Sequence, residues 1–286
     1  NKTIYTCIDV WNQMAALNLD RKALVINLGG GTLCDMGGFI ASTYKRGIHF
    51  FHIPTTLLSM SDSCIGGKLA VDLKGYKNIV GLFKNPKAVY INPGFLKTLP
   101  EKFVNSGFGE IIKHALISDK RFFNELLNND EIDKDLVKLI TRSLKIKFRI
   151  VGLDTTEKGV RKSLNFGHSI GHALETLSLK AKNETPLYHG EAIAAGMIME
   201  SYISFLRQLV SNSELDLIIK LISSRFKKVD LFEKDFKKII KLISQDKKNE
   251  FNRKLFTLID GIGRARINVE VADKEILESL KFYSNL

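Results

Sequence analysis

The sequence predicts an α/β domain built on a parallel sheet, followed by a mostly α-helical domain. Three observations lead to this fold class. Short apolar runs typical of buried parallel strands occur at 23–28, 48–54 and 87–91. A glycine run separates the first of these strands from a helix. After residue 98 strand signals thin out and helical periodicity dominates, so we expect two domains, 1–98 and 99–286.

The expected elements follow in a simple order. An apolar stripe from Ile4 to Leu17 predicts an amphipathic helix over 3–18. A long polar loop is expected over 55–78, and such loops on an α/β scaffold commonly carry function. Periodic apolar residues predict helices over 103–118, 121–128, 132–152, 166–180, 190–208, 213–224, 233–245 and 273–284. One strand-like run, 254–260, precedes the last helix.

Composition excludes several classes of protein. The 286-residue chain has a net charge of +12 and is 44% hydrophobic, which is typical of a globular protein with a buried core. Its Lys and Arg residues are dispersed, which argues against nucleic acid and favours anionic small substrates. The three unpatterned cysteines, Cys7, Cys34 and Cys64, indicate a reduced, cytoplasmic protein. No apolar run approaches the length of a membrane span.

Histidines and a carboxylate form the most suggestive pattern. The stretch NFGHSIGH (165–172) places His168 and His172 four residues apart, on one face of a helix. His189 follows in YHGEA, and Glu110 lies upstream in FGEIIKHA. These are ligand types of a zinc site, although an HxxxH pair alone supplies two ligands and often marks ordinary polar residues. The two glycines of the stretch predict that something approaches the helix backbone closely.

A second pattern points to anion binding. The glycine run 29–31 lacks the GxGxxG spacing and by itself fits a tight turn as well as a nucleotide site. Its place between strand and helix favours a site where backbone N–H groups face a pyrophosphate. Asp35 is expected in the first turn of that helix, favoured by the helix dipole or bonding a ligand amide. DSCIGGK (62–68) and Arg46 supply donors for a phosphate and a carboxylate, though each motif alone also fits a solvated loop.

Together, these motifs resemble one family. INLGGGTLCDMGGFIASTYKRG, IPTTLLSMSDSCIGGK, YKNIVGLF, FLKTLP, GFGEIIKHALISD, LNFGHSIGHALE, YHGEAIAAGM and DKKN occur in family-like order and spacing. Up to about Arg264 the chain resembles 3-dehydroquinate synthase. The resemblance implies a cytoplasmic, NAD- and metal-dependent homodimer without nucleic-acid or membrane partners. It also implies a Rossmann-like nucleotide-binding domain, a helical domain and an active site in the cleft between them.

The resemblance assigns roles to individual residues. Glu110, His168 and His189 match the ligands of zinc or cobalt, whereas His172 matches a contact to the substrate phosphate. Arg46 matches an arginine that reaches into the neighbouring subunit's site. The other matches to the substrate site are Asp62, Lys68, Lys77, Asn78, Lys113, Lys147, Arg161, Asn165 and Lys247, with Lys248 as an alternative to the last. The matches to NAD contacts are Gly29, Gly30, Gly31, Asp35, Thr55 and Thr56, joined by Lys68 and Lys77. From spacing alone, Lys113 would be half of a surface pair, and Lys147 and Arg161 would be exposed charges.

The implied reaction is a lyase step of the shikimate pathway, which leads to chorismate and the aromatic amino acids. It converts 3-deoxy-D-arabino-heptulosonate 7-phosphate to 3-dehydroquinate and phosphate. In the family, NAD transiently oxidises one hydroxyl, phosphate is eliminated, the hydride returns and an intramolecular aldol step closes the ring. A metal polarises the reacting hydroxyl, and the protein mainly holds the substrate and neutralises charge. This division of labour explains why cations and amides outnumber obvious bases in the matched set.

The chain also departs from the family pattern. Cys34 and Tyr76 stand where Gly is usual, and Cys64 replaces a common Ser. The family's chain begins several dozen residues earlier, with the first strands of the nucleotide domain and contacts to the adenosine ribose. We therefore expect weaker NAD binding than in a longer chain, with Lys2 as the remnant of that contact. Three alternatives stay open: a related sugar-phosphate cyclase, an NAD- and metal-dependent alcohol dehydrogenase of the same architecture, and a truncated homologue with weakened catalysis.

Overall fold

Two compact units make up the chain. A computed structural model describes residues 2–74, 76–128, 135–180, 186–245 and 253–286. The units are Asn1–Gly107 and Phe108–Leu286, and the division between them falls inside helix α3 (Glu101–Ser118). The boundary expected near residue 98 lies shortly before this division. No helix in the described ranges is both long and apolar enough to cross a membrane.

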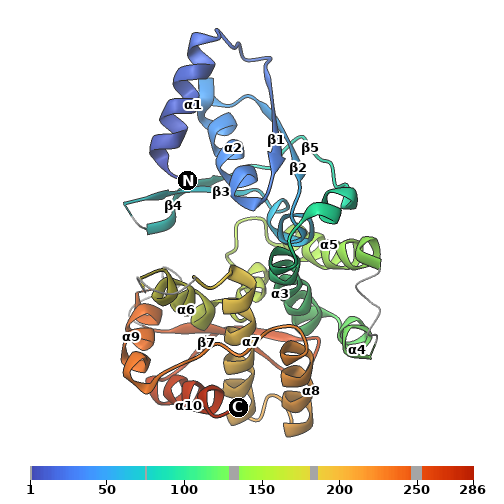
Figure 1. Cartoon of the computed structure of the whole chain (residues 1–286), viewed down its shortest axis with the longest axis vertical. Coiled ribbons are helices and arrows are strands. Elements are labelled where there is room, and N and C mark those ends of the chain that lie inside the picture. The colour runs from blue at the N-terminus through green and yellow to red at the C-terminus, as the bar shows by residue number, and fades with distance from the viewer. Residues whose placement is uncertain (1, 75, 129–134, 181–185, 246–252) are drawn as a thin grey trace. The chain divides into compact units, whose positions relative to one another are not determined.

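The first unit is an α/β structure with a parallel sheet, as predicted (Figure 1). Its elements are α1 (Ile4–Ala16), β1 (Leu24–Gly29), α2 (Gly31–Thr43), a 3-10 turn (Tyr44–Arg46), β2 (His49–Pro54), a π-helical turn (Ser59–Ser63), β3 (Lys68–Leu73), β4 (Tyr76–Phe83), β5 (Ala88–Val89) and a 3-10 helix (Pro93–Thr98). The parallel sheet has the order β1-β2-β5. Helix α2 packs on β1 and β2, and α1 packs on α2.

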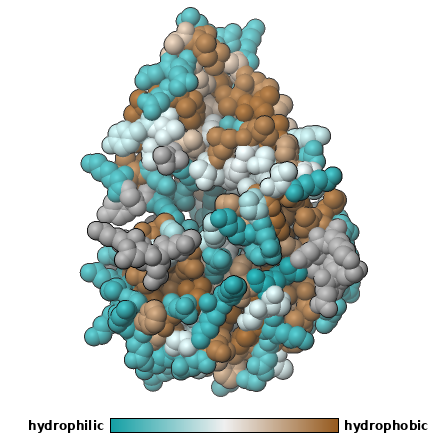
Figure 2. Space-filling model, viewed as in Figure 1, coloured by the Kyte–Doolittle hydropathy of each residue, from teal (hydrophilic) through white to brown (hydrophobic). Residues whose placement is uncertain are grey.

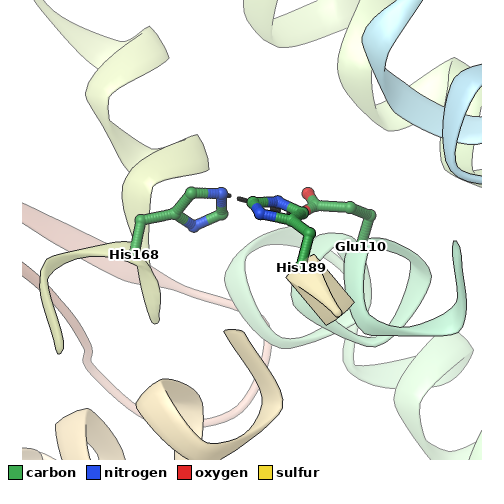
Figure 3. Close-up of side chains that lie close together, drawn as sticks. All are labelled: Glu110, His168 and His189. Carbon is green, nitrogen blue, oxygen red and sulfur yellow. Dashed lines mark ion pairs between the residues drawn. The ribbon is translucent and has the colours of Figure 1, made fainter. Parts of the chain in front are cut away.

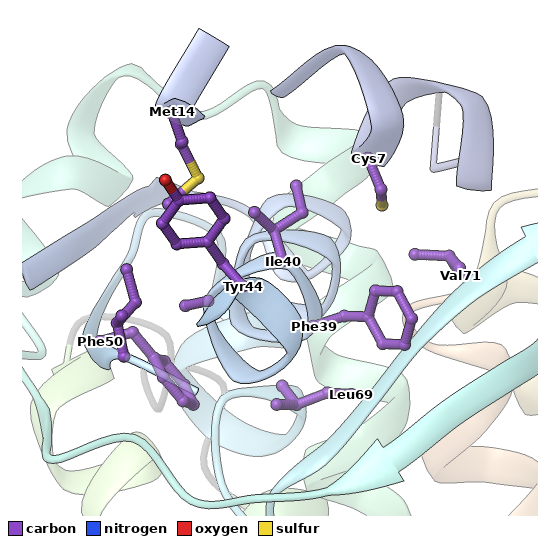
Figure 4. Packing of buried hydrophobic residues seen from close by; sticks show 10 residues of the cluster. Cys7, Met14, Phe39, Ile40, Tyr44, Phe50, Leu69 and Val71 are labelled. Carbon is purple, nitrogen blue, oxygen red and sulfur yellow. The ribbon is translucent and has the colours of Figure 1, made fainter. Parts of the chain in front are cut away.

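The core of this unit lies around α2 (Figure 4). Its buried cluster consists of Cys7, Met14, Phe39, Ile40, Ala41, Tyr44, Ile48, Phe50, Leu69 and Val71. Trp11 of α1 donates its Nε1 proton to the carbonyl oxygen of Ile40 at 3.1 Å, which ties α1 to α2. Packing on both sides fixes α2, and with it the glycine turn at its start.

The region 55–78, predicted as a long polar loop, contains most of an antiparallel hairpin instead. Strand β3 pairs with β4, with Ala70 opposite Gly81. Leu69 and Val71 alternate with more polar residues and are only 3% and 0% exposed. One face of the hairpin therefore packs against α2. The loop prediction is wrong because abundant Gly, Ser and Lys obscured a short period-two pattern.

The prediction of a fully buried strand is wrong for one face of β1. Leu24, Ile26 and Leu28 are 46%, 57% and 53% exposed, and Figure 2 shows hydrophobic surface over this strand. Asn27, between them, is buried and faces α2, since a Cβ on Gly37 would lie 1.9 Å from its Oδ1. Successive side chains of a strand point to opposite faces. Within the described residues, α2 covers only one of the two.

The second unit is mostly helical, as predicted. After α3 its elements are α4 (Lys120–Asn128), α5 (Leu136–Leu153), a 3-10 helix (Val160–Asn165), α6 (His168–Lys180), α7 (His189–Leu206), α8 (Asn212–Ser223), α9 (Glu233–Ser244), β6 (Leu255–Ile259), β7 (Ala265–Glu270) and α10 (Asp273–Ser284). Strand β6 confirms the predicted strand-like run. Its antiparallel partner β7 was not predicted.

Helix α7 is the central helix of this unit. It packs against α6, α8, α10 and β6 (Figure 1). Almost every residue from Gly190 to Ser204 is buried. A helix that is apolar on all sides needs neighbours on all sides, and α7 has them. Two carboxylates interrupt its apolar sequence, Glu191 in the first turn and Glu200, which is 0% exposed.

Candidate active site

Three side chains of metal-ligand type converge in the second unit (Figure 3). Glu110 Oε1 lies 3.4 Å from His168 Nε2 and 3.4 Å from His189 Nε2. The three ligand atoms all lie within 4.8 Å of one another. Glu110 lies within α3, whereas His168 and His189 are the first residues of α6 and α7. Residues far apart in the chain are thus brought to one point.

A glycine pair lets α3 approach α7 beside this group. A Cβ on Gly109 would lie 3.1 Å from both Cα and the carbonyl oxygen of Gly190. The two helices therefore meet backbone to backbone, next to Glu110 and His189. Larger residues at this crossing would separate the carboxylate from the imidazole.

Glycines also let α6 approach α7. A Cβ on Gly196 would lie 2.0 Å from the carbonyl oxygen of Gly167, and one on Gly171 would lie 2.9 Å from that of Ala192. Gly167 itself has a φ of +77°, which favours glycine. The close approach predicted for this stretch is therefore confirmed, and the neighbour is α7. It fixes the position of His168.

The separations fit a small divalent cation. In a tetrahedral site with bonds of about 2.0–2.1 Å, adjacent ligand atoms are about 3.3–3.4 Å apart. Both Glu110–imidazole separations are 3.4 Å. Two imidazole nitrogens and one carboxylate oxygen are a donor set of catalytic zinc sites, in which a further position stays open for substrate. The residues present therefore fit zinc or cobalt.

Two further contacts orient the imidazoles. His168 Nδ1 lies 3.0 Å from the carbonyl oxygen of Phe166 and donates its proton there, so Nε2 is the nitrogen directed at Glu110. His189 Nδ1 lies 3.7 Å from Glu175 Oε2, within ion-pair distance. A carboxylate behind a histidine is the usual way to fix the tautomer of a ligand. The sequence patterns do not single out Glu175, although its i,i+3 spacing from His172 on a helix is a usable signal.

The electrostatics keep the central carboxylate ionised. Burial alone raises the pKa of Glu110, but Lys113, His168 and His189 hold the pKa of this carboxyl well below its usual range. Burial lowers the pKa of His189, yet its interactions with Glu110 and Glu175 outweigh this and raise it to about 9. The Glu110 carboxylate therefore stays ionised at neutral pH, whereas His189 carries a proton that a bound metal ion would displace.

Three cations that spacing alone would place on the surface are buried. Lys113 pairs with Glu110 Oε2 and is 2% exposed, which leaves Oε1 facing the imidazoles. Lys147 on α5 is 5% exposed and Arg161 is 1% exposed. The expectation that these charges are exposed was wrong for all three, because each lies on a packed face of its element; on α5, Lys147 shares its face with the buried Ser143 and Ile150. Buried cations are costly unless anions accompany them.

A carboxylate-rich loop shapes the segment that precedes α6. Asp154 Oδ2 accepts the backbone N–H groups of Gly159 and Arg161 at 2.7 and 3.0 Å. Asn165 donates its Nδ2 proton to Glu157 Oε1 at 2.9 Å. The loop thereby holds both predicted substrate residues, Arg161 and Asn165. Neither Asp154 nor Glu157 stands out in the sequence, because local loop carboxylates carry no periodic signal.

His172 lies beside the ligand group. Its ring centroid is 5.1 Å from that of His168 and 6.0 Å from that of His189. His172, Glu175 and His189 also form a group of ligand-type atoms within 4.8 Å. Of the two groups, Glu110, His168 and His189 have the geometry better suited to a metal ion, because a buried carboxylate oxygen faces both imidazoles there.

The predicted phosphate turn lies in the first unit. Gly29 ends β1, Gly30 precedes α2 and Gly31 begins it. No side chain caps this helix. A Cβ on Gly31 would lie 2.6 Å from Ser63 Oγ, and one on Gly30 would lie 3.1 Å from Thr56 Cγ2. Backbone N–H groups at such an uncapped helix start are suited to a pyrophosphate.

Two predicted residues of this unit meet at Lys2. Lys2 Nζ donates to Asp35 Oδ2 at 2.6 Å and to Asn78 Oδ1 at 2.5 Å. The backbone N–H of Asn78 in turn donates to Asp72 Oδ1 at 2.8 Å. Asp35 was predicted in the first turn of its helix. This prediction is wrong, because α2 begins at Gly31 and Asp35 lies in its second turn.

The remaining predicted residues occupy separate elements. Thr55 follows β2, and its N–H donates to the carbonyl oxygen of Gly29 at 3.0 Å. Asp62 lies in the π-helical turn, Lys68 begins β3 and Lys77 lies on β4. Arg46 is exposed and ends the 3-10 turn after α2. Lys247 and Lys248 lie outside the described residues.

Known protein families match both parts of the chain. The models of the 3-dehydroquinate synthase N-terminal and C-terminal regions match residues 1–106 and 107–249. The chain is 40% identical over 288 residues to 3-dehydroquinate synthase of Parabacteroides distasonis, covering 99% of this chain and 80% of that protein. It is 38% identical to the bifunctional 3-dehydroquinate synthase/phosphatase of Fusobacterium nucleatum, of which it spans 43%.

Solved structures of other cyclases share the architecture. 2-Epi-5-epi-valiolone synthase of Streptomyces hygroscopicus subsp. jinggangensis, with NAD+ and Zn2+ bound, has a TM-score of 0.87 at 27% identity, covering 99% of this chain and 80% of that one. 2-Deoxy-scyllo-inosose synthase, complexed with carbaglucose-6-phosphate, NAD+ and Co2+, has a TM-score of 0.86 at 26% identity, covering 98% and 80%. A probable glycerol dehydrogenase of Sinorhizobium meliloti, at 13% identity and a TM-score of 0.63, shares the fold alone. With both regions matched and 40% identity along almost its whole length, the chain belongs to the 3-dehydroquinate synthase family.

Proposed function

We propose that the chain converts 3-deoxy-D-arabino-heptulosonate 7-phosphate to 3-dehydroquinate and phosphate, the lyase step of the shikimate pathway after which its family is named. The observation that carries this proposal is the convergence of Glu110, His168 and His189 in a chain whose two regions both match that family. The family depends on NAD and a divalent metal.

Glu110, His168 and His189 would hold the metal, which when bound polarises the reacting hydroxyl and the ketone derived from it. Lys113 keeps the Glu110 carboxylate ionised and fixes its second oxygen, so that Oε1 stays directed at the two imidazoles. Glu175 orients the ring of His189 through Nδ1, the nitrogen that does not face Glu110. The protein's own contribution here is orientation that exists before the metal arrives.

The glycine turn Gly29–Gly31 would hold the pyrophosphate of NAD, which supplies the hydride acceptor. Support comes from the start of α2, where Gly30 offers no side chain as a cap, and from the close approach of Thr56 and Ser63, which only glycines at 30 and 31 allow. The positive end of the helix dipole and free N–H groups favour such an anion. Asp35, Thr55 and Thr56 complete the proposed NAD set, with Lys68 and Lys77.

The substrate set of the second unit is built from cations and amides. Lys113 and His172 adjoin the metal group, and Arg161 and Asn165 lie on the 3-10 helix that leads into His168. A substrate with a phosphate and a carboxylate would compensate the cost of burying such cations. Lys147, Asp62, Lys68, Asn78 and Lys247 complete the proposed set.

The experiment is a phosphate-release assay with purified protein, the seven-carbon phosphosugar acid, NAD, and Zn2+ or Co2+. We expect phosphate and 3-dehydroquinate in equal amounts, with many turnovers per NAD and no accumulation of NADH. Glu110→Gln, which preserves shape but removes the ligand charge, is the matched control and should be inactive. If the wild-type protein, with metal and NAD bound, releases no phosphate, the proposed function fails.

The same assay separates the alternatives. A related cyclase would turn over another sugar phosphate in preference to this acid, whereas a dehydrogenase would accumulate NADH. Identity favours the proposed substrate, since it is 40% to a 3-dehydroquinate synthase and 27% to the valiolone synthase. A likeness to the glycerol dehydrogenase at 13% identity supports no activity.

We further propose that the protein is a cytoplasmic homodimer in which Arg46 reaches the partner's site. Support comes from the exposed position of Arg46 at the end of a turn, and from three buried cysteines that form no disulfide within the described residues. Mixing inactive Arg46→Ala and Lys68→Ala proteins should restore some activity, because one hybrid site regains both residues. No recovery after verified subunit exchange would exclude the shared site.

A further inference from the structure

Glu200 is a buried carboxylate in the middle of the most apolar helix. It is 0% exposed on α7. Its Oε2 accepts the backbone N–H of Gly167 at 2.6 Å, and its Oε1 accepts that of Ile170 at 3.1 Å. Burying a carboxylate is costly, so a residue of this kind needs strong, well-directed partners. The two N–H groups are such partners.

The two N–H groups belong to the start of α6. The first N–H groups of a helix have no partner within the helix, and a nearby side chain normally caps them. Here Gly167 has no side chain, and the carboxylate comes from α7 instead. Glu200 thus acts as a cap supplied by another helix, and the positive end of the α6 dipole favours its charge.

The capped segment brackets a proposed metal ligand. His168 lies between Gly167 and Ile170, so Glu200 fixes the backbone on both sides of it. The Nδ1 contact of His168 to Phe166 lies in the same segment. On α7, Gly196 lies one turn before Glu200, and its backbone packs directly against the carbonyl oxygen of Gly167. One face of α7 therefore holds the start of α6 by both contact and charge.

We infer that Glu200 is a positioning residue for His168, which holds its imidazole in the metal-binding orientation before metal arrives. The inference rests on the proposed role of His168 as a ligand. Loss of this cap would let the first turn of α6 relax, and the Nε2 atom would leave its place 3.4 Å from Glu110. Metal affinity should fall even where the fold survives.

The test uses Glu200→Gln, Glu200→Asp and a matched control, Ser204→Ala. Gln keeps the volume but turns an N–H donor toward one of the two backbone donors, whereas Asp keeps the charge on a shorter arm. Ser204 lies one turn further along α7, is 0% exposed and donates to the backbone carbonyl of Glu200 at 3.0 Å. It tests whether any buried polar change on this helix has the same effect.

The readouts are Co2+ affinity by chelator competition and the visible spectrum of the Co2+-loaded protein, both under conditions where each variant is folded. We expect a loss of affinity of roughly 10–100-fold for Glu200→Gln with an altered spectrum, a smaller loss for Asp, and no change for Ser204→Ala. Wild-type affinity and spectrum in folded Glu200→Gln would overturn the inference. If Gln does not fold, the same criterion applies to Asp.

A measurement on the unaltered protein is independent of folding defects. The amide protons of Gly167 and Ile170 should exchange slowly with solvent, although uncapped first-turn amides ordinarily exchange fast. Rapid exchange of both would refute the cap. The variant His168→Ala distinguishes failure of the proposed metal site from failure of the proposed role of Glu200. If it keeps its metal, the proposed site is wrong, whereas loss of metal in His168→Ala but not in Glu200→Gln refutes only the role of Glu200.

Discussion

Replacing Gly196 by Ala should destabilise the second unit by pushing apart α6 and α7. A Cβ at this position would lie 2.0 Å from the carbonyl oxygen of Gly167 and 2.8 Å from the N–H nitrogen of Gly171. These two atoms form the first hydrogen bond of α6, at 3.1 Å, so the methyl group would enter that bond. The obstacle is backbone, which cannot turn away as a flexible side chain can.

The magnitude follows from three contributions. Overpacking of a core costs about 1–3 kcal/mol, and straining the hydrogen bond that the Gly167 N–H donates to the Glu200 carboxylate costs up to about 1.5–3 kcal/mol. The better helix propensity of Ala offsets about 1 kcal/mol. A net loss of roughly 2–4 kcal/mol in the free energy of unfolding should lower the melting temperature of a unit of this size by about 4–16 °C.

The matched control is Gly152→Ala on α5. Nothing lies within 4 Å of a Cβ at Gly152, so only helix propensity changes, and stability should rise by about 0.5–1 kcal/mol. The assay is thermal unfolding of both variants in the metal-free state, followed by circular dichroism. Opposite shifts are expected from the same chemical change. A melting temperature for Gly196→Ala equal to or above that of the wild type would refute the close-contact explanation.

Three further predictions concern the site and the first unit. His189→Ala should abolish metal binding measured by elemental analysis, whereas His172→Ala should keep the metal and weaken substrate binding; the reverse pattern would reverse the assignment. Burial raises the pKa of Cys7 to about 11 and that of Cys34 to about 12, so both thiols should resist iodoacetamide at pH 8 until the protein unfolds; rapid labelling of the native protein would contradict this. Burial lowers the pKa of His52 to about 4, so the folded state resists its protonation. The free energy of unfolding should therefore fall by up to about 1.4 kcal/mol for each pH unit as the pH drops from 6.5 toward 4. The variant His52→Gln should lack this pH-dependent loss.

Local patterns in the sequence were sufficient to predict most of the helices and the parallel strands. The strand, glycine turn and helix at the start of the chain were predicted because apolar runs and glycine act over a few residues. The hairpin β3–β4 was missed because the Gly, Ser, Asp and Lys residues in and around it were interpreted as a polar loop. A clearer signal was available in KLAVDL, where Leu69 and Val71 alternate with other residues and are buried.

Within the site, helical spacing predicted some relations and not others. His168 and His172 were expected on one face of a helix, and their rings are indeed adjacent. The pairing of Glu110 with Lys113 follows from i,i+3 spacing, but its burial does not. Glu200 had one available signal, a single charge inside the apolar run of α7. That signal indicates a buried partner without saying which one.

The sequence by itself determined the family, the order of the helices and parallel strands, and the types of residue that the chemistry needs. These properties depend on residue identity and local spacing, which a linear pattern contains. Only the tertiary structure decided which carboxylate meets which imidazole nitrogen. Glu110 and His189 meet because Gly109 and Gly190 allow two backbones to touch, and a contact between residues so far apart in the chain leaves no periodic trace in it.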